Sequence, residues 1–137
     1  MRRDAFAAGA WAALLSGVPS TLHALATGRD PLEATKAAGS ILLPSTARTL
    51  PLVLAAAPVH LAVSFGWAFV LERAGVRGAP KGAAAGLAIC SLDLGVVGRR
   101  FPRIRELPLA PQIADHLAYG AVVGLVLERR RRRRAGI

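Results

Sequence analysis

The chain has 137 residues, a net charge of +10 and a hydrophobic fraction of 53%. Its mean hydropathy of +0.43 is high for a soluble protein. Lysines and arginines stand between long apolar runs instead of forming a stripe on amphipathic helices, which is typical of a multi-pass membrane protein and disfavours a soluble nucleic-acid-binding domain. The single cysteine, Cys90, excludes an intramolecular disulfide and a cysteine-rich metal site.

Four segments are apolar enough to be considered as helices that cross a bilayer core, which needs roughly 20 residues. The sequence therefore predicts an all-α integral membrane bundle, organised as a single membrane domain over 1–137. The predicted spans are about 5–27, 50–71, 82–98 and 107–127, followed by a basic cytoplasmic tail at 128–137. The third span is the weakest prediction because it is short and contains Asp93.

The first segment has a second interpretation as a cleaved signal peptide. Residues 1–26 combine a charged start, an apolar core and an A-x-A sequence ending at Ala26, and signal peptides share these features. We favour a retained span because the first helix of a multi-pass protein usually stays as an anchor. The intact mass of the purified protein would separate the two interpretations.

A short amphipathic helix is predicted at about 31–43, between the first two spans. Asp30 followed by Pro31, with Glu33 close behind, is a helix-start signature, and Pro44 predicts the end. The segment is too short to span a bilayer, so we expect an interfacial helix on the non-cytoplasmic surface. We favour an ordered connector over a functional lid.

The distribution of basic residues predicts the topology. Four spans place both termini and the 73–81 loop on one side, which then carries eleven of the 18 Lys and Arg residues. Without the third span the same charges divide evenly. The positive-inside bias therefore favours four spans with both termini cytoplasmic in a bacterial inner (plasma) membrane. The basic residues in the 99–105 loop, which this topology places outside, weigh against it.

Six consecutive arginines follow the last span after a single glutamate. No aromatic residue is interleaved with them for base stacking, so we expect no nucleic-acid partner. Next to a span, each arginine contributes about 1 kcal/mol of attraction to anionic headgroups. We therefore predict that the block anchors the chain to the lipid bilayer and fixes its topology. The block consists of Arg129, Arg130, Arg131, Arg132, Arg133 and Arg134.

Ionisable residues inside the predicted spans are the strongest functional signal, because an aspartate at mid-bilayer costs roughly 2.5–3.5 kcal/mol on insertion scales. His60 falls near the middle of its span and the others in the outer half of the bilayer. They could hydrogen-bond between helices, line a proton or ion pathway, or bind a metal. The metal interpretation is the weakest because no tight ligand motif is present. The five candidates are His23, His60, Asp93, Asp115 and His116.

Glycines spaced four apart predict close helix packing. Gly82 and Gly86 lie in the third span, and Gly120 and Gly124 in the fourth. Such small-residue faces let helix backbones approach closely, within one chain or between copies. They predict a tight bundle and suggest a homo-oligomer or a complex with another membrane protein.

Motifs for catalysis are missing from the sequence, and the chain has neither a nucleophile elbow nor a phosphate-binding loop. We therefore expect no catalytic residue, cofactor or bound metal, although an enzyme stays a distant third hypothesis. Our leading hypothesis is a non-enzymatic structural or accessory subunit that packs through its glycine faces. The alternative is a small proton-coupled transporter or channel subunit that uses the intramembrane His and Asp residues.

Overall fold

The computed structural model describes residues 2–136 of the chain, so that Met1 and Ile137, the last residue of the predicted tail, lie outside the described residues. Within that range the chain forms helices and turns and no β-strand, which confirms the all-α prediction. In chain order the helices are α1 (Arg2–Leu15), α2 (Val18–Thr27), α3 (Glu33–Gly39), α4 (Thr49–Arg73), α5 (Ala79–Leu92), the π-helix η1 (Asp93–Val97), the 3₁₀-helix η2 (Gly98–Arg100), α6 (Pro102–Arg105) and α7 (Leu109–Arg134).

Four stretches of helix are long and apolar enough to cross a membrane, as the sequence predicted. They run over Arg3–Thr27, Thr49–Arg73, Ala79–Arg100 and Leu109–Arg134. The third, which the sequence left in most doubt, is extended beyond 82–98 at both ends. It begins earlier because Pro80 fits the first turn of a helix, and it continues through η1 and η2.

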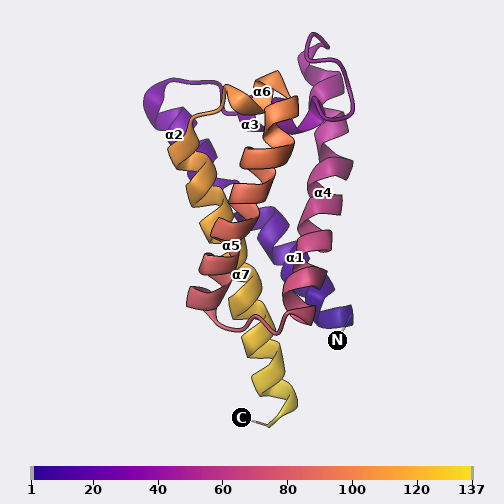
Figure 1. Ribbon diagram of the computed structural model, residues 1–137, viewed down its shortest axis with the longest axis vertical. Helices are drawn as coiled ribbons and strands as arrows, with labels where there is room; N and C mark the ends of the chain where they lie inside the picture. The colour runs from indigo at the N-terminus through magenta and orange to yellow at the C-terminus, as the bar shows by residue number, and fades with distance from the viewer. Residues whose placement is uncertain (1, 137) are drawn as a thin grey trace.

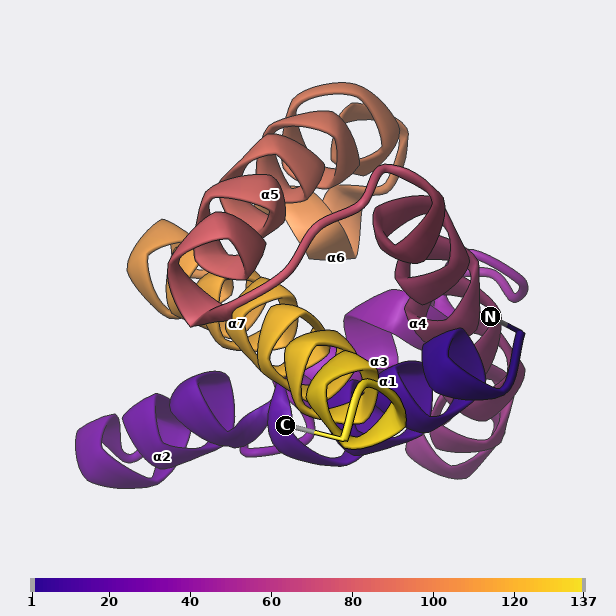
Figure 2. The same cartoon turned by 90° about the horizontal axis from the view of Figure 1, so that it is seen from below.

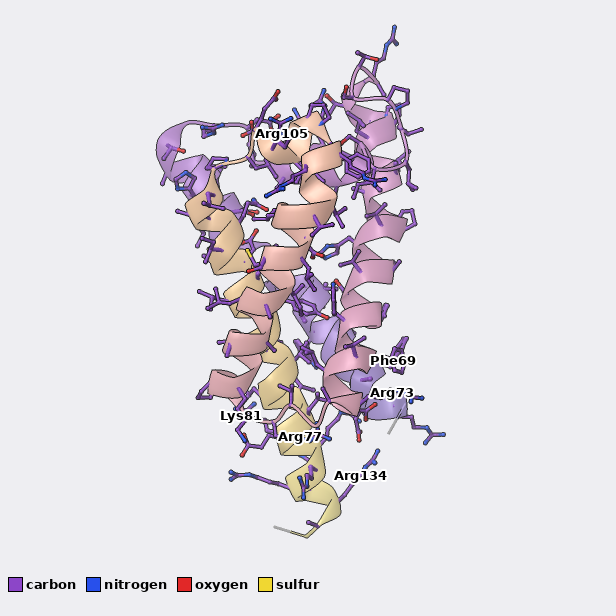
Figure 3. The ribbon with its side chains drawn as sticks, in the orientation of Figure 1. Phe69, Arg73, Arg77, Lys81, Arg105 and Arg134 are labelled. Atoms are coloured by element: carbon purple, nitrogen blue, oxygen red, sulfur yellow. The ribbon has the colours of Figure 1, made fainter. Side chains whose placement is uncertain are left out.

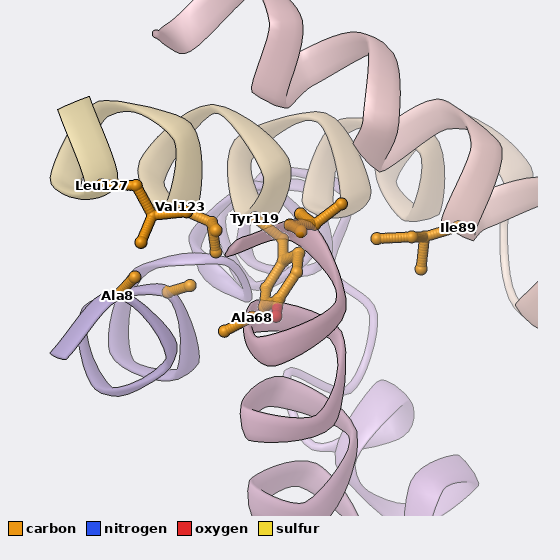
Figure 4. Packing of buried hydrophobic residues seen from close by; sticks show 8 residues of the cluster. Ala8, Ala68, Ile89, Tyr119, Val123 and Leu127 are labelled. Carbon is orange, nitrogen blue, oxygen red and sulfur yellow. The ribbon is translucent and has the colours of Figure 1, made fainter. Parts of the chain in front are cut away.

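α7 is the central helix of the bundle. It packs along α5 and α1 and also contacts α2 and α4 (Figures 1 and 2). Its buried side chains Tyr119, Val123 and Leu127 meet Ala8 and Ala68 in the core (Figure 4). Small core residues bring these helices close together, as in membrane bundles, where packing replaces the hydrophobic effect between helices.

Large apolar side chains cover the outside of the bundle. Phe6 is 59% exposed, Trp11 56% and Leu54 65%. In water such an apolar surface would favour aggregation, whereas it is the surface that a lipid-facing helix needs. The exposure pattern therefore agrees with the membrane assignment.

The glycine faces of α5 and α7 pack directly on each other. A Cβ atom on Gly120 would lie 2.8 Å from both the carbonyl carbon of Gly82 and the backbone nitrogen of Gly86, and closer still to the Gly82 oxygen. The N–H of Gly78 also donates a hydrogen bond to the carbonyl oxygen of Gly124 at 3.0 Å. The sequence left open whether these glycine faces pack within one chain or against a second copy or partner. In the structure they pack on each other within one chain.

Both termini lie at the same end of the bundle. Arg73, Arg77 and Lys81, from the α4–α5 connection, lie at that end together with Arg134, whereas Arg105 lies at the other (Figures 1 and 3). An even number of spans requires this arrangement. It matches the predicted grouping of the basic residues.

The arginine block continues α7 as a helix and is partly bound to the protein. Arg134 Nη2 lies 2.9 Å from Asp4 Oδ1, and Arg130 Nη1 lies 3.4 Å from the same oxygen. Arg132 pairs with Glu128 one turn earlier. Three of the six arginines are thus engaged by carboxylates of the chain, which leaves fewer of them for headgroups than the sequence suggested.

The end of the bundle opposite the termini is covered by α3 and α6. α3 is shorter than the predicted 31–43 helix because residues 31–32 and 40–42 form turns, and it packs into the bundle against α4. Gly39 makes this possible, since a Cβ there would lie 2.7 Å from the carbonyl carbon of Leu52. Lys36 and the N–H of Leu32 both bind the Asp30 carboxylate and lower its pKa, which fixes the start of the helix.

Candidate functional site

A cavity of about 730 Å³ lies between the spans and is covered by α3. Its volume falls within the roughly 300–1,000 Å³ that is typical of small-molecule sites. Much of its lining is apolar, and the side chains of Leu14, Val63 and Val97 at its surface are exposed on the outside of the bundle. The polar and aromatic residues that line it are Ser16, Ser20, Thr21, Thr35, His60, Ser64, Trp67, Asp93, Gln112, Asp115, His116 and Tyr119.

The structure brings four of the five ionisable candidates to this cavity. They come from α4 (His60), η1 (Asp93) and α7 (Asp115 and His116). His23 does not line this cavity and instead lies with Arg29 and Pro108 at a small adjoining pocket. The set of three histidines that the metal interpretation required is therefore not assembled, and within residues 2–136 no group of three His, Cys, Asp or Glu side chains could hold an ion.

The first span is broken at Ser16 and Gly17, where α1 ends and α2 begins. The sequence predicted one continuous helix here, and the missed signals were Gly17 and Pro19, which occupies the first turn of α2. A break inside a membrane leaves backbone groups that lipid cannot satisfy, so other parts of the protein or water in a cavity must bind them.

Two of the ionisable candidates bind the backbone at this break. His60 Nε2 lies 2.8 Å from the carbonyl oxygen of Ala13 and must be the donor, because a carbonyl oxygen only accepts. On the other side, Asp115 Oδ1 accepts the backbone N–H of Ser20 at 2.9 Å, in the first turn of α2. A carboxylate at a helix N-terminus is also favoured by the helix dipole. Asp115 and His60 therefore stabilise the broken span.

Asp93 of η1 and His116 of α7 form a pair between the third and fourth spans. His116 Nδ1 lies 2.8 Å from the carbonyl oxygen of Gln112 and must donate to it. The other ring nitrogen, Nε2, lies 3.4 Å from Asp93 Oδ2. A carboxylate and an unprotonated nitrogen are both acceptors, so their contact requires a proton on one of them. The pair is either carboxylate with imidazolium or carboxylic acid with imidazole, and both forms contain one transferable proton.

Asp93 also begins the π-helix that ends α5. The N–H of Gly98 donates to the carbonyl oxygen of Asp93, five residues earlier, which widens the helix at this point. π-helical turns are uncommon and occur frequently at functional sites. No clear sequence pattern predicts this turn, apart from Gly95 and Gly98, which follow Asp93 closely.

Tyr119 is a cavity residue that the sequence analysis did not select as a site residue. Its hydroxyl donates to the carbonyl oxygen of Ser64 and connects α7 to α4. Its spacing of four residues from Asp115 places both on one face of α7, and both line the cavity. The face that Tyr119 shares with Asp115 was the sequence signal that could have identified Tyr119 as a cavity residue.

Cysteine accessibility tests whether water enters the cavity. In a Cys90→Ala background, we expect Val59→Cys to react with a membrane-impermeant thiol reagent in membranes and Leu61→Cys to react at least tenfold more slowly. The two positions have nearly the same depth on α4, but Val59 lines the cavity whereas Leu61 does not and is 47% exposed on the outside. A thiolate forms only where water reaches the sulfur. Equal rates would mean that the cavity is as dry as the lipid-facing surface.

The chain matches no protein-family model, no curated protein and no solved structure, so the assignment of a function rests on this geometry alone.

Proposed function

We propose that the protein is a small multi-pass transporter that couples movement of a small molecule to movement of a proton. The observation that carries this proposal is the Asp93–His116 pair at the surface of a 730 Å³ cavity between the spans. The cavity provides room for a solute, and the pair provides one proton that the solute can displace.

Structural hydrogen bonding alone accounts less well for this pair than for the other ionisable residues. His60 and Asp115 have a structural task, because they bind backbone groups at the break in the first span. Asp93 has no comparable task, and its side chain, 28% exposed, contacts only His116 among the described hydrogen-bonding partners. An intramembrane carboxyl group is expensive, which favours a functional reason for its presence.

The proposal includes an orientation in the bacterial inner membrane with both termini in the cytoplasm. The end that contains both termini has the larger share of basic residues, and basic residues are retained on the cytoplasmic side. Arg129, Arg131 and Arg133 make no ion pair within residues 2–136, which leaves their side chains for anionic headgroups.

The accessory-subunit hypothesis was based on the glycine faces of the third and fourth spans, and these faces are not available to a partner. Gly82, Gly86, Gly120 and Gly124 are buried between α5 and α7, so a partner or a second copy would need a different face. The transporter hypothesis gains a cavity that the sequence could not reveal. We therefore place the transporter ahead of the accessory subunit.

Proteoliposomes with an entrapped pH-sensitive dye test the transport function. With a proton gradient imposed, we expect at least one compound from a panel of quaternary amines, carboxylates and neutral amphipathic solutes to move protons through the wild-type protein. Asp93→Asn should insert normally and show no solute-dependent proton movement, because an amide cannot carry the shared proton.

The matched control is Glu106→Gln, which removes a carboxylate that is exposed and lies outside the cavity. It should behave as wild type. Proton movement of equal size in Asp93→Asn, or no response of the wild type to any solute class, would contradict the proposed function.

A further inference from the structure

We propose that the cavity binds a monovalent organic cation with an apolar body, and that this cation displaces the single proton of the Asp93–His116 pair. This inference rests on the proposed function and names its substrate class. It follows from the charges that surround the cavity, from the character of its walls and from the hydrogen bonds that fix each carboxylate.

The cavity excludes the positive charge that dominates the rest of the chain. The protein has 18 Lys and Arg residues, yet none of those in the described range lines the cavity, whereas two aspartates do. An anionic solute would meet these carboxylates in a region of low dielectric constant with no lysine or arginine to bind it. A cationic solute would find the opposite charge that its desolvation requires.

The walls suit an apolar body around that charge. Val59, Val63, Ile89 and Leu94 line the cavity beside the aromatic side chains of Trp67 and Tyr119. Aromatic residues favour quaternary ammonium and related cations over strongly hydrated ions such as sodium. Binding pockets with mostly apolar walls and few polar groups commonly hold drug-sized organic molecules.

Asp93 is the carboxylate that can change partner. Asp115 is bound by the Ser20 N–H at the start of α2, so it is tied to the backbone of the broken span. Asp93 instead contacts His116 at 3.4 Å, a long and weak contact that a cation can replace. The other titratable groups at the cavity are His60 on α4 and Tyr119 on α7, and Cys90 is the neighbouring group on α5.

The exchange balances in charge and in protons. With its shared proton, the pair has no net charge, whether the proton is on Asp93 or on His116. Loss of that proton to water leaves the Asp93 carboxylate and neutral His116, with a net charge of −1. A monovalent cation restores neutrality, so one proton leaves for each cation that binds.

Tetraphenylphosphonium, with tetraphenylborate as an anion of matched shape, tests this inference on the full chain in detergent. We expect the wild type to bind the cation, to release one proton per cation into a weakly buffered solution, and to gain about tenfold in apparent affinity per pH unit while the pair is protonated, as linkage requires. We expect no saturable binding of tetraphenylborate.

Two variants and a control accompany the measurement. Asp93→Asn and Asp93→Ser should each abolish proton release, and a size-exclusion profile like that of the wild type shows that a variant is folded. Two variants are used so that a failure of one to fold leaves the other informative. Glu106→Gln should release one proton per cation as the wild type does.

Each outcome has a definite meaning. Saturable binding of tetraphenylborate with similar affinity, or cation binding without proton release, would overturn the exchange. If the cation does not bind while carboxylates or neutral solutes move protons in the proteoliposome assay, the cation assignment fails and proton-coupled transport stands. If no solute moves protons, the proposed function itself fails.

Discussion

Gly120→Ala is expected to destabilise the bundle by about 1–3 kcal/mol or more, the range for overpacked cores. The added methyl group would lie 2.8 Å from the carbonyl carbon of Gly82 and closer still to its oxygen. These are backbone atoms of a neighbouring helix, so no side-chain rotation can relieve the clash, and α5 must move away from α7. The loss should appear as a lower unfolding temperature in detergent and should not depend on protein concentration.

Gly66→Ala is the matched control for this variant. Gly66 lies in α4, and a Cβ there would meet nothing within 4 Å. Both changes replace a helical glycine with alanine and share the same gain in helix propensity, so their difference isolates the clash. If both variants were equally stable, or if only an oligomer dissociated while each chain kept its stability, the packing of α5 on α7 would be contradicted.

Asp115→Ala should cost about 1 kcal/mol of stability, toward the lower end of the penalty for a donor left without a partner, because the Ser20 N–H is only partly buried. The Ser20 N–H would lose the acceptor that Asp115 holds in place at the start of α2, and water in the cavity replaces a fixed acceptor only in part. We expect the loosened break to increase proteolysis and amide hydrogen exchange in α2 before the rest of the bundle. Hydrogen exchange followed by mass spectrometry measures this directly.

Asp115→Asn separates the hydrogen bond from the charge. The asparagine oxygen can still accept from Ser20, and asparagine is as good an N-cap as aspartate. This variant should therefore retain most of the protection in α2, whereas Asp115→Ala loses it. Equal loss in both variants would show that the carboxylate charge stabilises the break and that the hydrogen bond adds little.

The spans were predictable because their signal is additive along the sequence. Any window of about 20 apolar residues has few alternatives to a transmembrane helix, and the basic residues at its ends limit its position. The number of spans also predicted that both termini lie at the same end of the bundle, because four is an even number. The weak third span was correct because Asp93 is tolerated once it has a partner, His116, on another helix.

The site was less predictable because it depends on angles and contacts between helices. Five ionisable residues at similar depth gave no information on which of them meet, and His23 is separated from the rest because α2 follows a break at Gly17. The glycine spacing predicted close packing, but it could not distinguish a neighbour in the same chain from one in another. The π-helix at Asp93 depends on the register of the whole third span, and no local sequence pattern specifies that register.

The central position of α7 has a consequence for biogenesis. It leaves the ribosome after the other three described spans, yet α5 makes its main contacts with it and α1 packs along it. During synthesis α1 can pair with α4 once both have been inserted. The glycine face of α5 stays exposed to lipid until α7 is inserted. α7 therefore completes this bundle of four spans, and a chain truncated before α7 would present an unsatisfied helix surface to membrane proteases.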